Sequence, residues 1–92
     1  MLTEQRCDLM ISGKVQGVGF RYSVKLKAES LGLKGYVKNQ RDGSVFVAVQ
    51  GETVVVDDFV NWCYQGPPAA DVCGIEKITR GIEEFREFSV RY

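Results

Sequence analysis

The chain has 92 residues, of which 45% are hydrophobic and 26% are charged, a composition typical of one compact domain rather than of a disordered or fibrous protein. Twelve basic and twelve acidic residues give a net charge of zero, so the chain lacks the basic excess expected of nucleic-acid-binding or membrane-surface proteins. It has no apolar run of the ~18 residues that cross a bilayer, and its N-terminus lacks the apolar core of a signal peptide. We therefore expect a single domain over residues 1–92, with neither a nucleic acid nor a membrane as partner.

Two segments near the N-terminus have clear periodicity. Residues 6–12 alternate apolar and polar side chains, which predicts a strand with one buried face. Residues 21–31 place apolar side chains at helical spacing, with Tyr22 and Leu26 beside the main stripe, and Gly32 is a natural helix stop. The glycine-rich stretch between these two elements is expected to be a loop.

The middle of the chain predicts a hairpin followed by a second helix. A strand begins at Tyr36, and Asp42-Gly43 is a strong turn signal because glycine adopts the positive φ that a tight turn requires. Residues 44–50 alternate valines with other side chains, which predicts a third strand. Thr53 is in position to cap a helix over residues 54–64.

The C-terminal third predicts the remaining strands. Gly66-Pro67-Pro68 ends the second helix, residues 72–79 form a fourth strand, and residues 87–91 form a short last strand. The order is therefore β-α-β-β-α-β with an added strand. Two amphipathic helices and a sheet with one buried face predict an α+β two-layer sandwich with both helices on one face. This is the ferredoxin-like βαββαβ fold, whose antiparallel sheet has the order 4-1-3-2.

Three cysteines and no histidine argue against a conventional zinc site. Cys7, Cys63 and Cys73 contain no C-x-x-C pair, and we interpret all three as small buried side chains in a reducing compartment. The expected location is the cytoplasm.

The segment GKVQGVGFR, residues 13–21, lies between the first strand and the first helix. Unpaired amides and the dipole at a helix N-terminus favour an anion, and Gly17 and Gly19 would let the backbone approach it closely. Arg21 can add a bidentate clamp for a phosphate. A glycine-rich turn with a surface arginine fits the composition equally well, and neither the Walker nor the dinucleotide signature is present.

The same segment resembles the first signature of the acylphosphatase family, G-x-V-Q-G-V-x-F-R. The segment GYVKNQRDGSVFVAVQG, residues 35–51, resembles the second signature, G-[aromatic]-V-x-N-x-x-D-G-x-V-x-x-x-x-x-G, at every fixed position. The resemblance extends to Gly66-Pro67 and to the last strand. It implies an enzyme, expected to be a monomer, that hydrolyses acyl phosphates to a carboxylate and inorganic phosphate by metal-free attack of water on phosphorus.

The resemblance also implies roles for individual residues. Arg21 matches the phosphate-binding arginine of the family, and Asn39 matches the asparagine that orients the attacking water. The implied phosphate-binding loop consists of Val15, Gln16, Gly17, Val18, Gly19, Phe20 and Arg21. No metal and no organic cofactor is implied. Gln40 and Arg41 stand where some relatives have small hydroxyl residues, which leaves open how Asn39 is held.

The sequence leaves two other interpretations open. One is a non-enzymatic binding module on the same fold, for an RNA or protein partner, with Tyr36, Phe46 and Met10 on the face of the sheet away from the helices. Neutral charge and the absence of an RNA-binding signature disfavour it. The other is a similar domain that serves carbamoyl phosphate within a larger maturation protein. Because the sequence stops at Tyr92, we expect a free-standing enzyme.

Overall fold

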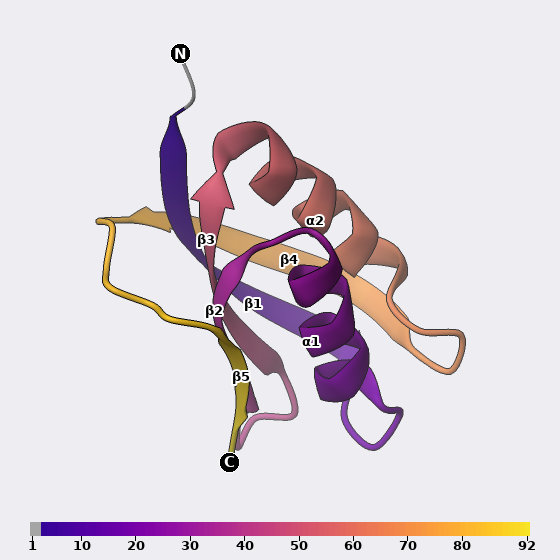
Figure 1. The fold of residues 1–92 in the computed structure, drawn as a ribbon. Helices are drawn as coiled ribbons and strands as arrows, with labels where there is room; N and C mark the ends of the chain where they lie inside the picture. Colours follow the sequence, from indigo (N-terminus) through magenta and orange to yellow (C-terminus); the bar gives the residue numbers. More distant parts are fainter. Residues whose placement is uncertain (1–2) are drawn as a thin grey trace.

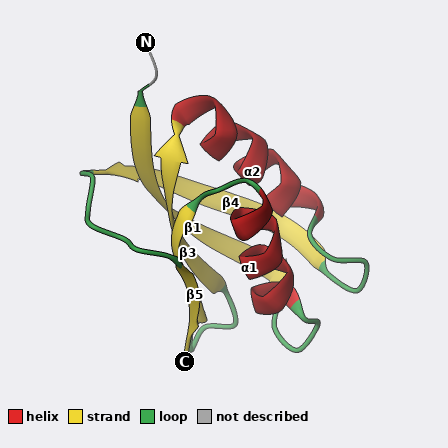
Figure 2. Cartoon of the chain, in the orientation of Figure 1, coloured by secondary structure: helices red, strands yellow, loops and turns green. Residues whose placement is uncertain are grey.

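The structure, a computed structural model, describes residues 3–92. Its elements follow in the order β1 (Glu4–Lys14), α1 (Phe20–Ser30), β2 (Lys34–Asn39), β3 (Val45–Glu52), α2 (Thr53–Gln65), β4 (Asp71–Arg80) and β5 (Phe88–Arg91). Both helices lie against one face of a single sheet, which confirms the predicted two-layer sandwich (Figures 1 and 2). No helix in residues 3–92 combines the length and apolar character needed to cross a membrane.

The strands are arranged in the order β4-β1-β3-β2-β5. The predicted order 4-1-3-2 is therefore confirmed for the first four strands, all of which pair antiparallel with their neighbours. β5 is the added strand that the sequence predicts; it pairs parallel with the outer edge of β2, so the five-stranded sheet is mixed. Phe88, the first residue of β5, is only 1% exposed and pairs with Gly35, so its side chain joins the core.

The core lies between the sheet and the helices. Alternate residues of the central strands point into it, and the stripes on both helices meet them. The buried apolar side chains in strands and helices include Cys7, Leu9, Ile11, Val24, Ala28, Val37, Val45, Val47, Val49, Val56, Phe59, Cys63 and Phe88. Tyr22 and Leu26, which the periodicity put beside the α1 stripe, are 65% and 47% exposed and lie outside it. The face of α1 that packs on the sheet therefore includes fewer apolar residues than the periodicity predicts.

The two predicted helix ends differ in outcome. Gly32 has φ 71° and its N–H donates to the carbonyl of Glu29, so it ends α1 as expected. Thr53 does not cap α2, which begins at Thr53 itself and has no side-chain cap. The N–H and hydroxyl of Thr53 instead both donate to the carbonyl of Thr3, at 2.9 and 3.1 Å. The hydroxyl therefore ties the helix start to the beginning of β1.

The cysteine interpretation holds for two of the three thiols. Cys7 and Cys63 are buried, and burial raises the pKa of both thiols. Cys73 is exposed, so the prediction is wrong there. It is the extra residue of a bulge in edge strand β4, since Ser12 pairs with Gly74 and Gly13 with Val72. The described cysteines are all free, and the cytoplasmic location stays a prediction.

The open face of the sheet is partly covered by residues 81–87, the segment between β4 and β5, here called the strap (Figure 1). The Phe85 ring in the strap lies 6.2 Å from the Tyr36 ring, and the Arg6 guanidinium lies 5.5 Å from Phe85. Asp8 beneath is only 6% exposed and accepts hydrogen bonds from Arg6 and Arg80. The strap therefore shields a charged cluster that strand alternation alone would leave in solvent.

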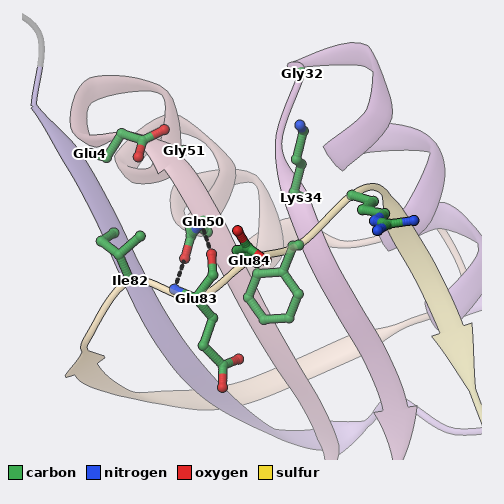
Figure 3. Close-up of a pocket in the computed structure, with 10 residues that line it drawn as sticks. Glu4, Gly32, Lys34, Gln50, Gly51, Ile82, Glu83 and Glu84 are labelled. Atoms are coloured by element: carbon green, nitrogen blue, oxygen red, sulfur yellow. Dashed lines mark hydrogen bonds between the residues drawn. The ribbon is translucent and has the colours of Figure 1, made fainter.

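A pocket of about 600 Å³ lies between the strap and the ends of β2 and β3 (Figure 3). On one side of it, Gln50 donates to the Glu83 carbonyl at 2.7 Å and accepts from the Glu83 N–H at 2.9 Å. Lys34 and Glu84 line the same pocket, so its charges are mixed. Since Lys34 pairs with Gln50 while Asn39 pairs with Val45, this pocket lies at the opposite end of β2 from Asn39.

Candidate active site

Arg21 and Asn39 line one pocket although 18 positions separate them in the sequence. β1 and β2 are both antiparallel to β3, so the loop after β1 and the C-terminal end of β2 lie at the same end of the strands. The pocket at this end of the sheet has a volume of about 200 Å³. Its lining consists of Val15, Gly17, Gly19, Phe20, Arg21, Tyr22, Asn39, Val90 and Tyr92. We call it the Arg21 pocket.

The loop between β1 and α1 presents bare backbone to this pocket. Gly17 and Gly19 have φ values of 73° and 76°, in the left-handed region that favours glycine. A Cβ at either position would meet nothing within 4 Å, because both positions face open space. Gly19 is the N-cap of α1 and no side chain caps the helix. The first amides of α1 therefore have no side-chain acceptor and are available to an anion.

Buried side chains and one glutamine anchor this loop. Val15 and Phe20 are each 1% exposed, and Val18 packs partly against the core. Gln16 Nε2 donates to the carbonyl oxygens of Gln40 and Ser44, at 2.7 and 2.9 Å. Val15 and Phe20 are among the residues that line the Arg21 pocket, whereas Gln16 and Val18 are not. Gln16 instead fastens the loop to the turn that follows Asn39.

Arg21 is a cation without an acidic partner among the described residues. Its guanidinium carbon lies 4.7 Å from the centre of the Tyr92 ring, in cation–π geometry. None of the ion pairs formed within residues 3–92 includes Arg21, and the first turn of α1 contains no acidic residue. The positive charge at the mouth of the pocket is thus uncompensated by any described neighbour.

Asn39 has an amide oxygen with no protein partner. Its Oδ1 is buried and accepts no hydrogen bond from the described residues. Leaving a buried acceptor unsatisfied costs about 1–3 kcal/mol, so this atom strongly favours a donor that enters the pocket. A water molecule is the smallest such donor.

The turn after Asn39 is held by its own hydrogen bonds. The Gln40 N–H donates to the Ser44 carbonyl at 2.9 Å, and the Gly43 N–H donates to the Gln40 carbonyl. The Asp42 carboxylate accepts from the Ser44 hydroxyl at 2.6 Å and from the Ser44 N–H at 2.9 Å. These two bonds, the hydroxyl bond first, hold the pKa of Asp42 below its usual range. No side-chain hydrogen bond of Gln40 or Arg41 reaches Asn39.

The sequence did not point to three residues that line the pocket. Val90 and Tyr92 reach it because β5 pairs with β2, and Tyr22 follows Arg21 on the first turn of α1. The sequence predicts a short terminal strand, but the alternation of its residues does not reveal which edge of the sheet it joins. Among residues 3–92 no group of three or more Cys, Asp or Glu side chains is arranged to hold a metal ion.

Comparisons with known proteins give one consistent result. The acylphosphatase family model matches residues 7–90. The chain is 49% identical over 81 residues to an acylphosphatase from Acaryochloris marina, covering 88% of this chain and 87% of that protein. The solved acylphosphatase from Coxiella burnetii is 40% identical with a TM-score of 0.92, covering 96% and 93% of the two chains. That from Bacillus subtilis is 35% identical with a TM-score of 0.93, covering 96% and 99%.

These matches define a small hydrolase with a ferredoxin-like fold. The chain belongs to the acylphosphatase family. It is an enzyme that hydrolyses the carboxyl–phosphate bond of acyl phosphates, giving a carboxylate and inorganic phosphate. The comparisons give no support to the non-enzymatic binding module that the sequence left open.

Proposed function

We propose that hydrolysis takes place in the Arg21 pocket, without a metal ion, and that Arg21, the β1–α1 loop and Asn39 carry it out. One observation carries the proposal: an unpaired guanidinium, a glycine-lined backbone and an unsatisfied amide oxygen converge on a single pocket of about 200 Å³. Each of the three supplies something that the reaction requires.

The phosphoryl group is bound by positive charge and backbone donors. Arg21 offers two parallel N–H donors to two phosphoryl oxygens, and no acidic side chain among the described residues neutralises its positive charge. The amides of residues 15–20 surround the remaining oxygens, and the N-terminal end of α1 adds its dipole. Such fixed donors stabilise the charge that spreads over the equatorial oxygens in the transition state.

The leaving group needs little help. An acyl phosphate is a mixed anhydride, and the bond that breaks releases a carboxylate, which leaves without protonation. A loose phosphoryl transition state also places weak demands on the nucleophile. Positioning and charge stabilisation therefore suffice, which supports a mechanism without a metal or a histidine.

Asn39 orients the attacking water. Its Oδ1 accepts a hydrogen from the water and aims the oxygen at phosphorus, in line with the departing carboxylate. The new oxygen–phosphorus bond forms as the carboxyl oxygen–phosphorus bond breaks. The water's proton passes to a phosphoryl oxygen of the substrate, so the products are a carboxylate and inorganic phosphate. A neutral amide suits this position because a carboxylate would repel the phosphate.

The experiment compares Arg21→Ala, Arg21→Lys and Asn39→Ala with the unchanged chain, and uses Arg86→Ala in the strap as a surface control. Hydrolysis of benzoyl phosphate gives kcat and KM, and calorimetry gives the affinity for inorganic phosphate. We expect Arg21→Ala to lose activity by at least about 100-fold together with phosphate binding, and Arg21→Lys not to restore either. Asn39→Ala should lose kcat by about 100-fold with phosphate affinity nearly unchanged.

Several outcomes would contradict the proposal. A folded Arg21→Ala protein with near-normal turnover would remove the proposed role of the guanidinium. If Asn39→Ala lost phosphate affinity as completely as Arg21→Ala, Asn39 would bind the phosphate instead of positioning water. Activity should persist in excess EDTA, and complete loss that magnesium or zinc restores would overturn the metal-free mechanism.

A further inference from the structure

A second groove begins where the Arg21 pocket ends. It has a volume of about 610 Å³ and lies over the end of β2 on the open face of the sheet. Asn39 and Tyr92 line both the groove and the Arg21 pocket, so the two spaces meet at these residues. A molecule whose phosphoryl group occupies the Arg21 pocket can therefore extend its other end into this groove. We call it the open-face groove.

Two aromatic rings line the groove. Tyr36 on β2 and Phe46 on β3 have ring centroids 5.8 Å apart and an interplanar angle of 33°. Both residues are only partly buried and both line the groove, so part of each side chain borders its open space. A flat or apolar body packs favourably against such a pair.

Two cations lie beside these rings, and a third lines the groove. Lys38 Nζ lies 5.6 Å from the Phe46 ring centre, and the Arg91 guanidinium carbon lies 3.8 Å from the Tyr36 ring centre. Lys38 and Arg91 are also partners in the β2–β5 register. Arg41 follows on the turn and lines the groove.

No acidic side chain neutralises these cations. None of the three forms an ion pair within residues 3–92. The one acidic side chain among the residues that line the groove, that of Asp42, already accepts two hydrogen bonds from Ser44. The groove therefore has a local positive excess in a chain whose net charge is zero.

We propose that the open-face groove receives the acyl group of the substrate and selects acyl groups that carry a second anionic group on a flat or apolar body. The aromatic pair packs against the body, and Lys38, Arg41 and Arg91 attract the distal anion. This inference rests on the proposed function, because it assumes that the phosphoryl group occupies the Arg21 pocket. It assigns substrate preference to residues that take no part in phosphate binding or water positioning.

The test compares benzoyl phosphate with 4-carboxybenzoyl phosphate. A para carboxylate adds a distal charge and changes the leaving group's acidity little. The ratio of the two kcat/KM values therefore measures how strongly the groove favours the distal carboxylate. We expect the carboxylated substrate to be favoured about fivefold at low ionic strength, and the preference to fall toward one in about 0.5 M salt. The substrate 4-(aminomethyl)benzoyl phosphate should be disfavoured relative to benzoyl phosphate for the opposite reason.

Two double variants locate the effect. Lys38→Gln with Arg41→Gln should lower the ratio substantially toward one, because it removes two of the three cations and leaves Arg91. Lys34→Gln with Arg86→Gln removes the same charge from the pocket at the other end of β2 and should leave the ratio unchanged. Circular dichroism on both variants establishes that they fold alike.

Two results would overturn the inference: a ratio near one in the unchanged chain at low salt, or the same ratio in both double variants. Neither result would contradict the proposed function, since Arg21→Ala would still lose hydrolysis of all three substrates. If Arg21→Ala instead hydrolysed all of them normally, the proposed function itself would fail, and the acyl assignment with it.

Discussion

Gln16 offers the sharpest test of how the site is assembled. Its side chain reaches from the β1–α1 loop to the turn after Asn39 and donates to two carbonyl oxygens, at 2.7 and 2.9 Å. Gln16→Ala removes both hydrogen bonds. The two bonds together contribute about 1–3 kcal/mol, and the lower half of that range applies because each carbonyl retains a backbone donor. A loss of about 1–2 kcal/mol lowers Tm by roughly 5–15 °C for a domain of this size.

The same change should slow catalysis. Without Gln16, the loop that bears the phosphate donors and the turn that carries Asn39 are no longer joined, so the water and phosphorus are less well aligned. We expect kcat to fall about tenfold, with phosphate affinity changing less, because misplacement by a fraction of an ångström is felt mainly in the transition state. Thermal unfolding and benzoyl phosphate kinetics, measured well below Tm, give the two quantities separately.

Gln50→Ala is the matched control. Gln50 also makes two hydrogen bonds to backbone, donating to and accepting from Glu83 at 2.7 and 2.9 Å, but at the opposite end of the sheet (Figure 3). It should cost a similar free energy of unfolding and leave kcat unchanged. If Gln16→Ala and Gln50→Ala lowered Tm equally and neither changed kcat, the bridge would serve stability alone and the reasoning would be refuted.

Three further predictions follow from the same geometry. Gly17→Val should weaken inhibition by inorganic phosphate. It should cost only about 1–2 kcal/mol of stability, because the φ of 73° is unfavourable for valine but an added Cβ meets nothing within 4 Å. Unchanged phosphate inhibition in a folded variant would show that Gly17 is a turn residue only. Asp42→Asn should lower the free energy of unfolding at neutral pH. Because the folded pKa of Asp42 is lowered, this difference should persist above about pH 5 and shrink as pH falls below about 4; a difference independent of pH in urea titrations would contradict it. Ellman's reagent should label Cys73 promptly in the native protein and all three cysteines after denaturation, and prompt reaction of Cys7 or Cys63 would show that the core opens readily.

Much of the fold could be predicted because it depends on short-range periodicity. The alternation around Leu9, the helical stripe through Val24 and Ala28, and the turn at Asp42-Gly43 each specify an element without reference to distant residues. The proximity of Arg21 and Asn39 followed from the sheet order, since two parallel strands that flank a third end at the same edge.

The rest depends on contacts that no local pattern encodes. The pairing of β5 with β2, and with it the contribution of Tyr92 to the site, depends on where the strap crosses the sheet. Cys73 is the extra residue of a bulge in β4, which appears only when β4 is paired with β1. The Thr53 hydroxyl donates to the carbonyl of Thr3, 50 positions away, instead of capping α2. The structural role of Gln16 was also hidden, because its acceptors lie on a different loop.

The pairing of β5 with β2 also bears on aggregation. An uncovered β2 would present its backbone donors and acceptors to other molecules, and a sheet edge of this kind is a template for intermolecular pairing. β5 covers that edge with only four residues, and its own outer edge is short and ends at the charged Arg91. Val90 belongs to the strand that covers β2 and also lines the Arg21 pocket. A ligand bound there stabilises the covered state by mass action, so occupancy of the site should also suppress self-association.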